Sequence, residues 1–254
     1  MDALILTAKE LMYAAFQLGA DRFFGLPDPF YGMEPEEIRR EIGELQLSLE
    51  KKGYAQLGFD DVFALKAPVK EFLETTALCD RYVMLQGEGH DAAPLTVLYC
   101  REGCRALLRQ DAQQLTLTEP AARDMKDSIA RALGGAFDTD GAPQAVLLSE
   151  EVLTAAQLAA PDDPQQAQTL LTGQGCGEQT AALLVQGFRR EIGFHLLCEG
   201  DLKRRSLRHL IVIGNGKARI SLVPEDIDQR LWRVQVGVDA SAVKRLLDGE
   251  EESV

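Results

Sequence analysis

The order of the expected helices and strands repeats along this chain, and the repeat constrains the fold more than any other feature. A helix, four strands and another helix are predicted over residues 68–133, and the same order returns over residues 177–248. Gly87 and Gly200 occupy equivalent places, each at the end of the first strand of its copy. This spacing predicts two similar half-size folds in one chain.

The turn between the second and third strands recurs at the same spacing as these glycines. Residues 101–103 form the turn in the first copy and residues 214–216 form it in the second, where Asn-Gly is a strong hairpin signal. Residue identity between the copies is low, so the order of elements repeats rather than the sequence. We therefore expect an α+β fold with two antiparallel-sheet halves, 1–135 and 136–254, related by a pseudo-twofold and packed as one compact unit.

Two further helices are expected before the first copy. Thr7 and Glu10 form a capping box at the start of a helix that runs to Leu18. Pro35 suits the first turn of a second helix, and the run Lys51-Lys52-Gly53 ends it. N-terminal helices therefore precede the repeated halves.

An aromatic-rich loop connects these two helices. It holds Phe23, Phe24, Phe30 and Tyr31 within a short stretch. Such a cluster most often seals a helix against a sheet. The alternative is an exposed surface to which a partner docks.

The charge balance excludes some classes of partner. The chain has 27 basic and 40 acidic residues, which gives a formal net charge of −13. Binding to nucleic acid or to an anionic membrane surface needs clustered Lys and Arg, so neither is expected. No apolar run approaches the roughly 18 residues that a membrane-spanning helix needs, and the N-terminus does not resemble a secretory signal. We expect a protein without membrane insertion.

The cysteines indicate the redox environment. There are five, without a CxxC pair, so a reduced and cytoplasmic protein is the simplest interpretation. Cys100 and Cys104 are expected to face each other across the first hairpin and to remain thiols.

One short run could carry chemistry. Gly175-Cys176-Gly177-Glu178-Gln179 resembles the internal-thioester motif of the complement and α2-macroglobulin family. The resemblance implies that the Cys176 thiolate could condense with the side chain of Gln179. The alternative is a glycine-rich entry to a helix, with Glu178 favourable in the first turn and Cys176 a small apolar residue, and we favour it.

Other catalytic and metal-binding patterns are absent from the sequence. It contains no GxSxG elbow, no HExxH helix and no phosphate-binding GxxxxGK[ST] loop. A metal site from His195, Cys198 and His209 is disfavoured, because one strand points the side chains of His195 and Cys198 to opposite faces. The sequence therefore predicts a protein that is not an enzyme and has no cofactor or metal.

Three segments resemble the EspG-like specificity chaperones of type VII (ESX) secretion systems, including their shorter relatives in Gram-positive bacteria. They are the opening run Leu6–Ala20, the loop Gly25–Gly32 and the segment Leu45–Gly53, LQLSLEKKG. The repeated ββββα half also resembles the quasi-twofold fold of that family. The resemblance implies a cytosolic, non-enzymatic protein that binds a helical, hairpin-shaped secretion substrate and keeps it soluble for export.

The resemblance also implies where the substrate would bind. Members of the family use the central sheet, a loop between its second and third strands, and C-terminal helices. The expected partner-binding residues are Arg101, Glu102 and Gly103 of the matching loop, together with Phe30 and Tyr31 of the aromatic loop. Two alternatives stay open, namely an interaction scaffold with no role in secretion and a thioester protein or enzyme that uses Cys176.

Overall fold

The structure is a computed structural model that describes residues 3–20, 22–58, 62–89, 93–120, 124–132, 145–214, 218–226, 228–238 and 240–248. The chain divides into two compact units. The first contains Met1–Tyr82, Leu95–Met125 and Asp201–Ser206, and the second contains Val83–Pro94, Lys126–Gly200 and Leu207–Val254. The pseudo-twofold relation between the halves stays a prediction.

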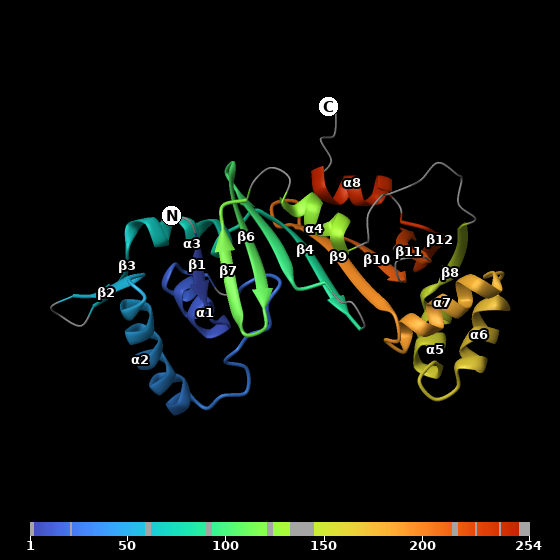
Figure 1. Ribbon diagram of the computed structural model, residues 1–254, viewed down its shortest axis with the longest axis horizontal. Coiled ribbons are helices and arrows are strands. Elements are labelled where there is room, and N and C mark those ends of the chain that lie inside the picture. The colour runs from blue at the N-terminus through green and yellow to red at the C-terminus, as the bar shows by residue number, and fades with distance from the viewer. Residues whose placement is uncertain are drawn as a thin grey trace. The chain divides into compact units, whose positions relative to one another are not determined.

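The first unit combines helices with short antiparallel strands (Figure 1). Its elements are β1 (Leu4–Leu6), α1 (Ala8–Gln17), α2 (Pro35–Lys51), β2 (Ala55–Leu57), β3 (Phe63–Leu65), α3 (Ala67–Ala77), β5 (Thr96–Arg101), β6 (Cys104–Asp111) and β7 (Gln114–Thr118). The strands of its main sheet lie in the order β1-β7-β6-β5, and β2 pairs only with β3.

The remaining elements lie wholly or mostly in the second unit. They are β4 (Arg81–Glu88), α4 (Asp124–Ala132), β8 (Ala145–Ser149), α5 (Glu150–Ala159), α6 (Pro164–Thr172), α7 (Glu178–Phe188), β9 (Gly193–Asp201), β10 (Ser206–Gly214), β11 (Arg219–Asp226), β12 (Leu231–Val236) and α8 (Ala240–Asp248). Its strands lie in the order β4-β9-β10-β11-β12-β8. Figure 1 shows α5, α6 and α7 gathered beside β8.

The predicted repeat of elements is confirmed. The order α3-β4-β5-β6-β7-α4 returns as α7-β9-β10-β11-β12-α8. Gly87 lies in β4 and Gly200 in β9, the first strand of each copy. The expected Asn-Gly turn at residues 215–216 lies outside the described residues. An α+β fold with antiparallel strands is therefore established.

The core of the first unit forms where helices α1 and α3 meet the sheet. As predicted, the Thr7 hydroxyl accepts a hydrogen bond from the Glu10 N–H, and the Glu10 carboxylate accepts one from the Thr7 N–H. Leu11 of α1, Leu73 of α3 and Leu107 of β6 are fully buried. β1, β2 and β3 were not predicted, because three residues are too short for an alternating pattern to show.

The core of the second unit lies between its sheet and helices α5, α6 and α7. Ile213, Leu222 and Val234 contribute the sheet side of this core. Gly187 of α7 lies so close to Ile213 that an added Cβ would overlap it, and this close approach explains the glycine. Within the described part of the chain, no helix combines the length and apolarity needed to cross a membrane.

Candidate functional site

The hairpin between β5 and β6 is the first part of the candidate site. Arg101 and Cys104 are paired across the strands, which leaves Glu102 and Gly103 as a two-residue turn. Their φ angles are 48° and 85°, so both occupy the left-handed region that a tight hairpin turn of this length requires. The turn is therefore one residue shorter than the predicted 101–103.

The shorter turn changes where the two hairpin cysteines point. Cys100 pairs with Arg105, and Cys104 pairs with Arg101. Because neighbouring residues of a strand point to opposite faces, Cys100 and Cys104 lie on opposite faces of the sheet. The expectation that they face each other was wrong by one residue of register. All five cysteines are free thiols.

Arg101 anchors the hairpin to helix α3. Its Nη1 lies 3.4 Å from the carbonyl oxygen of Glu74 and 3.9 Å from the Glu74 carboxylate. A cation beside the last turn of a helix also offsets the partial negative charge there. The predicted binding residue Arg101 is therefore half-buried and positions the hairpin, whereas Glu102 and Gly103 are exposed at its tip.

Asp80 joins the same hairpin to a second turn. Its Oδ2 accepts a hydrogen bond from the Glu102 N–H at 3.3 Å and lies 2.9 Å from the Nζ of Lys203, in the turn after β9. The Asp80 backbone oxygen also accepts from the Leu202 N–H at 2.8 Å. The hydrogen bond from Lys203 lowers the pKa of the Asp80 carboxyl. Sequence reasoning missed this link, because Asp80 and Lys203 are far apart in the chain.

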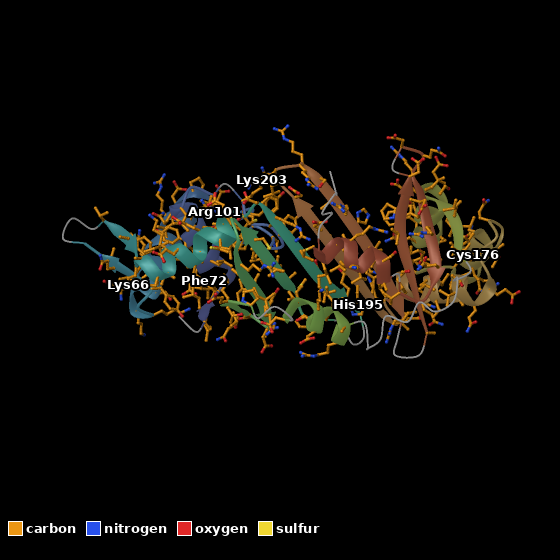
Figure 2. The ribbon with its side chains drawn as sticks, turned by 90° about the horizontal axis from the view of Figure 1, so that it is seen from above. Lys66, Phe72, Arg101, Cys176, His195 and Lys203 are labelled. Carbon is orange, nitrogen blue, oxygen red and sulfur yellow. The ribbon has the colours of Figure 1, made fainter. Side chains whose placement is uncertain are left out.

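A cavity of about 500 Å³ lies beside the hairpin, and we call it the hairpin cavity. Helix α3, the hairpin and the segment after β7 supply its walls, with Pro68, Glu71, Phe72, Thr75, Gly103, Cys104, Arg105, Glu119 and Pro120. Figure 2 shows Phe72 on α3 and Arg101 at the hairpin.

The walls of the hairpin cavity mix charge with apolar surface. Glu71 and Glu119 are exposed carboxylates, and Arg105 is an exposed guanidinium. Phe72 is half-buried and adds the largest apolar surface. Such a cavity can hold an apolar side chain with a cationic group at its rim. Of the predicted site residues, only Gly103 lines it, because the other walls come from segments that no local motif connects.

The first half of the aromatic loop is a plug, as expected. Phe23 is 5% exposed, and its ring meets the Tyr99 ring edge-on at 5.4 Å. Phe24 stacks on Tyr82 at 4.9 Å, and its carbonyl oxygen accepts a 2.6 Å hydrogen bond from the Tyr99 hydroxyl. These contacts fix the loop within the first unit.

The second half of the loop faces solvent. Tyr31 is 89% exposed, and Phe16 of α1 is 41% exposed. The Phe30 ring lies 6.5 Å from the Phe16 ring. Phe30 and Tyr31, the two residues predicted to bind a partner, therefore lie on an accessible aromatic surface that is separate from the plug.

Cys176 and Gln179 lie in different environments. Cys176 is 4% exposed and belongs to the core of the second unit, beside helices α5–α7 (Figure 2). Burial raises the pKa of its thiol to about 11, which keeps the thiol neutral near pH 7. Gln179 is exposed in the first turn of α7. This arrangement favours the structural interpretation of the run.

Among the described residues, no group of three or more His, Cys, Asp and Glu side chains is placed to hold a metal ion. His195 and Cys198 are both buried in β9. Their positions in one strand, three residues apart, point their side chains to opposite faces, as the sequence predicted.

Comparison with known proteins identifies a solved structure with a similar fold. No protein-family model and no curated protein matches the sequence. The structure is similar to that of the Mycobacterium tuberculosis type VII secretion system chaperone EspG5, solved in complex with the PE25–PPE41 dimer. The TM-score is 0.64 at 12% sequence identity, over 97% of this chain and 96% of the EspG5 chain. This chain therefore has the fold of EspG5, in agreement with the resemblance of its N-terminal segments.

Proposed function

We propose that this chain is a non-enzymatic chaperone of a type VII secretion system. It binds a helical secreted protein in the cytoplasm and keeps that protein soluble until export. The observation that carries the proposal is the fold shared with EspG5 over 97% of the chain, because EspG5 is a type VII secretion chaperone and was solved with a bound PE25–PPE41 dimer.

The hairpin cavity is our candidate for the main contact with the partner. Phe72 and the two prolines, Pro68 and Pro120, offer apolar surface, while Glu71 and Glu119 place carboxylates at the walls. A helix of the partner would insert an apolar side chain and set a basic residue beside these carboxylates.

Two anchors favour binding at the hairpin by holding its shape. Arg101 ties the hairpin to Glu74, and Asp80 binds both the Glu102 N–H and Lys203. A surface that is already ordered loses less entropy when a partner binds. Arg101 then acts by positioning Glu102 and Gly103, which are the parts of the predicted loop that remain accessible.

The half-buried Phe30 and the exposed Tyr31 offer a second contact. Tyrosine is enriched among residues that dominate binding energy, because it combines a large apolar ring with a hydroxyl. Its 89% exposure leaves nearly the whole Tyr31 side chain available.

Co-expression tests the proposal. The full chain is produced together with each small helical protein encoded beside it, and complexes are identified by size exclusion with light scattering. We expect a stable complex with one such protein. The Glu71→Lys/Glu119→Lys double variant should weaken that complex at least tenfold, and Tyr31→Ala should weaken it less.

A matched control separates the cavity from the overall charge. Asp162→Lys/Glu191→Lys makes the same charge change at exposed positions of the second unit and should leave the affinity within twofold. A folded, monodisperse chain that binds none of the helical proteins would favour a general scaffold and overturn the proposal. Equal losses in both double variants would place the contact away from the hairpin cavity.

A further inference from the structure

Strand β8 is an outermost strand of its sheet, beside β12. It has five residues, Ala-Val-Leu-Leu-Ser, and none of them is charged. Strands at an edge usually carry charge or proline, or are covered, because their unpaired backbone groups attract other strands. β8 has neither charge nor proline, so it lacks the residues that usually prevent another strand from pairing with an edge.

The register identifies which backbone groups of β8 face away from β12. The Glu150 N–H donates to the Arg230 oxygen at 2.8 Å, and the pairing continues without a bulge to Ala145. In an antiparallel pair, hydrogen-bonded and non-bonded residues alternate. Leu148 and Val146 therefore bond to β12, and the N–H and C=O of Leu147 point outward.

The hydrogen bonds of β12 support this assignment. The Gly237 N–H donates to the Arg219 oxygen of β11 at 2.8 Å. By the same alternation, the odd-numbered residues of β12 bond to β11, and its even-numbered residues face β8. The β8–β12 and β11–β12 pairings therefore give the same set of β12 residues facing β8. The outward direction of the Leu147 backbone is thus supported by two independent hydrogen bonds.

The outward side of β8 is accessible in the described part of the chain. No described residue hydrogen bonds to the Leu147 backbone, and the Leu147 side chain is 54% exposed. The Ser149 N–H points the same way. These groups offer a ladder of donors and acceptors together with one apolar side chain.

The charges next to this edge indicate what fits it. Glu150 and Glu151 follow β8 directly, and both are exposed. Both residues lie in the first turn of α5, next to the end of β8. An incoming strand without negative charge, carrying a basic residue at its end, complements both the uncharged ladder and these carboxylates.

We propose that the free edge of β8 binds an extended, uncharged segment of another polypeptide that has a basic residue at its end. The segment adds a strand to the sheet, with backbone hydrogen bonds to Leu147 and Ser149 supplying affinity. Leu147 adds an apolar contact, and Glu150 and Glu151 select the basic end. This inference goes beyond the proposed function and does not depend on it.

A labelled peptide, acetyl-Lys-Thr-Val-Thr-Val-Thr-Lys-amide, tests the inference on the full chain by fluorescence anisotropy. The same peptide with alternate backbone nitrogens methylated is the control, because it keeps the charge and cannot complete the ladder. We expect the methylated peptide to bind at least tenfold more weakly. Amide exchange at Leu147 and Ser149 should slow when the unmodified peptide is added.

Two protein variants locate the binding. Leu147→Pro removes an outward-facing N–H and restricts the backbone locally, which an edge strand tolerates, and should weaken binding at least tenfold. Leu147→Thr keeps the N–H and should weaken it about threefold or less. If Leu147→Pro does not fold, the methylated peptide still decides the question on the unaltered protein.

Three results would overturn the inference. Equal binding of the two peptides would show that no ladder forms. Slow exchange of the Leu147 amide in the free protein would show that the chain covers its own edge. A dimer that Leu147→Pro dissociates would assign the edge to a second copy of this chain.

Discussion

The outermost strands β1 and β8 differ in whether their outward-facing backbone N–H and C=O groups have hydrogen-bond partners. Leu4, Ile5 and Leu6 of β1 are all in register with β7, but hydrogen-bonded and non-bonded residues alternate, and the backbone groups of Ile5 point outward. The Ile5 N–H donates to the Tyr54 hydroxyl at 3.1 Å, and its carbonyl oxygen accepts from the Lys52 Nζ at 3.2 Å. Side chains thus occupy the edge of β1, whereas no described residue occupies that of β8.

The difference shows that an edge is closed by side chains from other segments of the chain, not by the strand itself. Lys52 reaches β1 because its Nζ is held by the buried Glu10 carboxylate at 2.7 Å. The Ser48 hydroxyl also donates to Glu10 at 2.7 Å. Among the described residues, no side chain bonds to the outward backbone groups of β8 in this way. This is consistent with an edge to which another strand binds.

Removing Glu10 should break the closed edge and give the largest effect. Glu10→Ala leaves the Thr7 N–H and the Ser48 hydroxyl without this acceptor and frees Lys52 from its partner. We expect a loss of about 2–3 kcal/mol in the free energy of unfolding, measured with urea. The control Glu41→Ala breaks an ion pair with Lys9 at the surface and should cost less than about 1 kcal/mol. Equal losses would contradict a special role for Glu10.

The same carboxylate makes part of the stability depend on pH. Burial alone would raise the pKa of Glu10, but hydrogen bonds from Lys52, Ser48 and the Thr7 backbone lower it below its ordinary value of 4.5. A lowered pKa in the folded state adds stability above pH 4.5 that is lost as the pH falls through the folded-state pKa. The stability difference between the native chain and Glu10→Gln should therefore be constant from pH 8 to about pH 6 and shrink below pH 4.5. A difference that grows on acidification would reverse the assigned shift.

The sequence predicted the N-terminal helices and the position of the first hairpin because their signals are local. The capping box at Thr7, Pro35 at the start of α2 and the glycine of the first hairpin each act within a few residues. The register of that hairpin was missed by one residue, since both Glu102 and Gly103 adopt positive φ and shorten the turn.

The candidate site was predicted less completely because it is assembled from distant segments. Glu71 and Glu119 line one cavity from α3 and from the end of β7, and Asp80 bridges to Lys203. No spacing in the sequence connects these residues. The closure of β1 by Lys52 was missed for the same reason, because β1 itself gave no pattern.

A milder change opens the edge of β1 without disturbing Glu10. Tyr54→Phe removes the hydroxyl that accepts from the Ile5 N–H, and water can replace it because the bond is exposed. We expect a loss of about 0.5–1 kcal/mol in the free energy of unfolding. Amide exchange at Ile5 should become faster, measured by NMR, while exchange at Leu4 and Leu6 stays unchanged. Unchanged exchange at Ile5 would show that the Tyr54 hydroxyl does not protect this amide.

The smallest effect on stability is expected at the open edge. Leu147→Lys replaces a 54% exposed side chain, so the free energy of unfolding should change by no more than about 0.5 kcal/mol. A lysine on a free edge strand opposes pairing with another strand, because the pairing would bury or crowd its charge. Fluorescence anisotropy should then show that the peptide with basic ends binds more weakly than it binds to the native chain. A loss above about 1.5 kcal/mol would mean that Leu147 is packed, and β8 would then be a closed edge like β1.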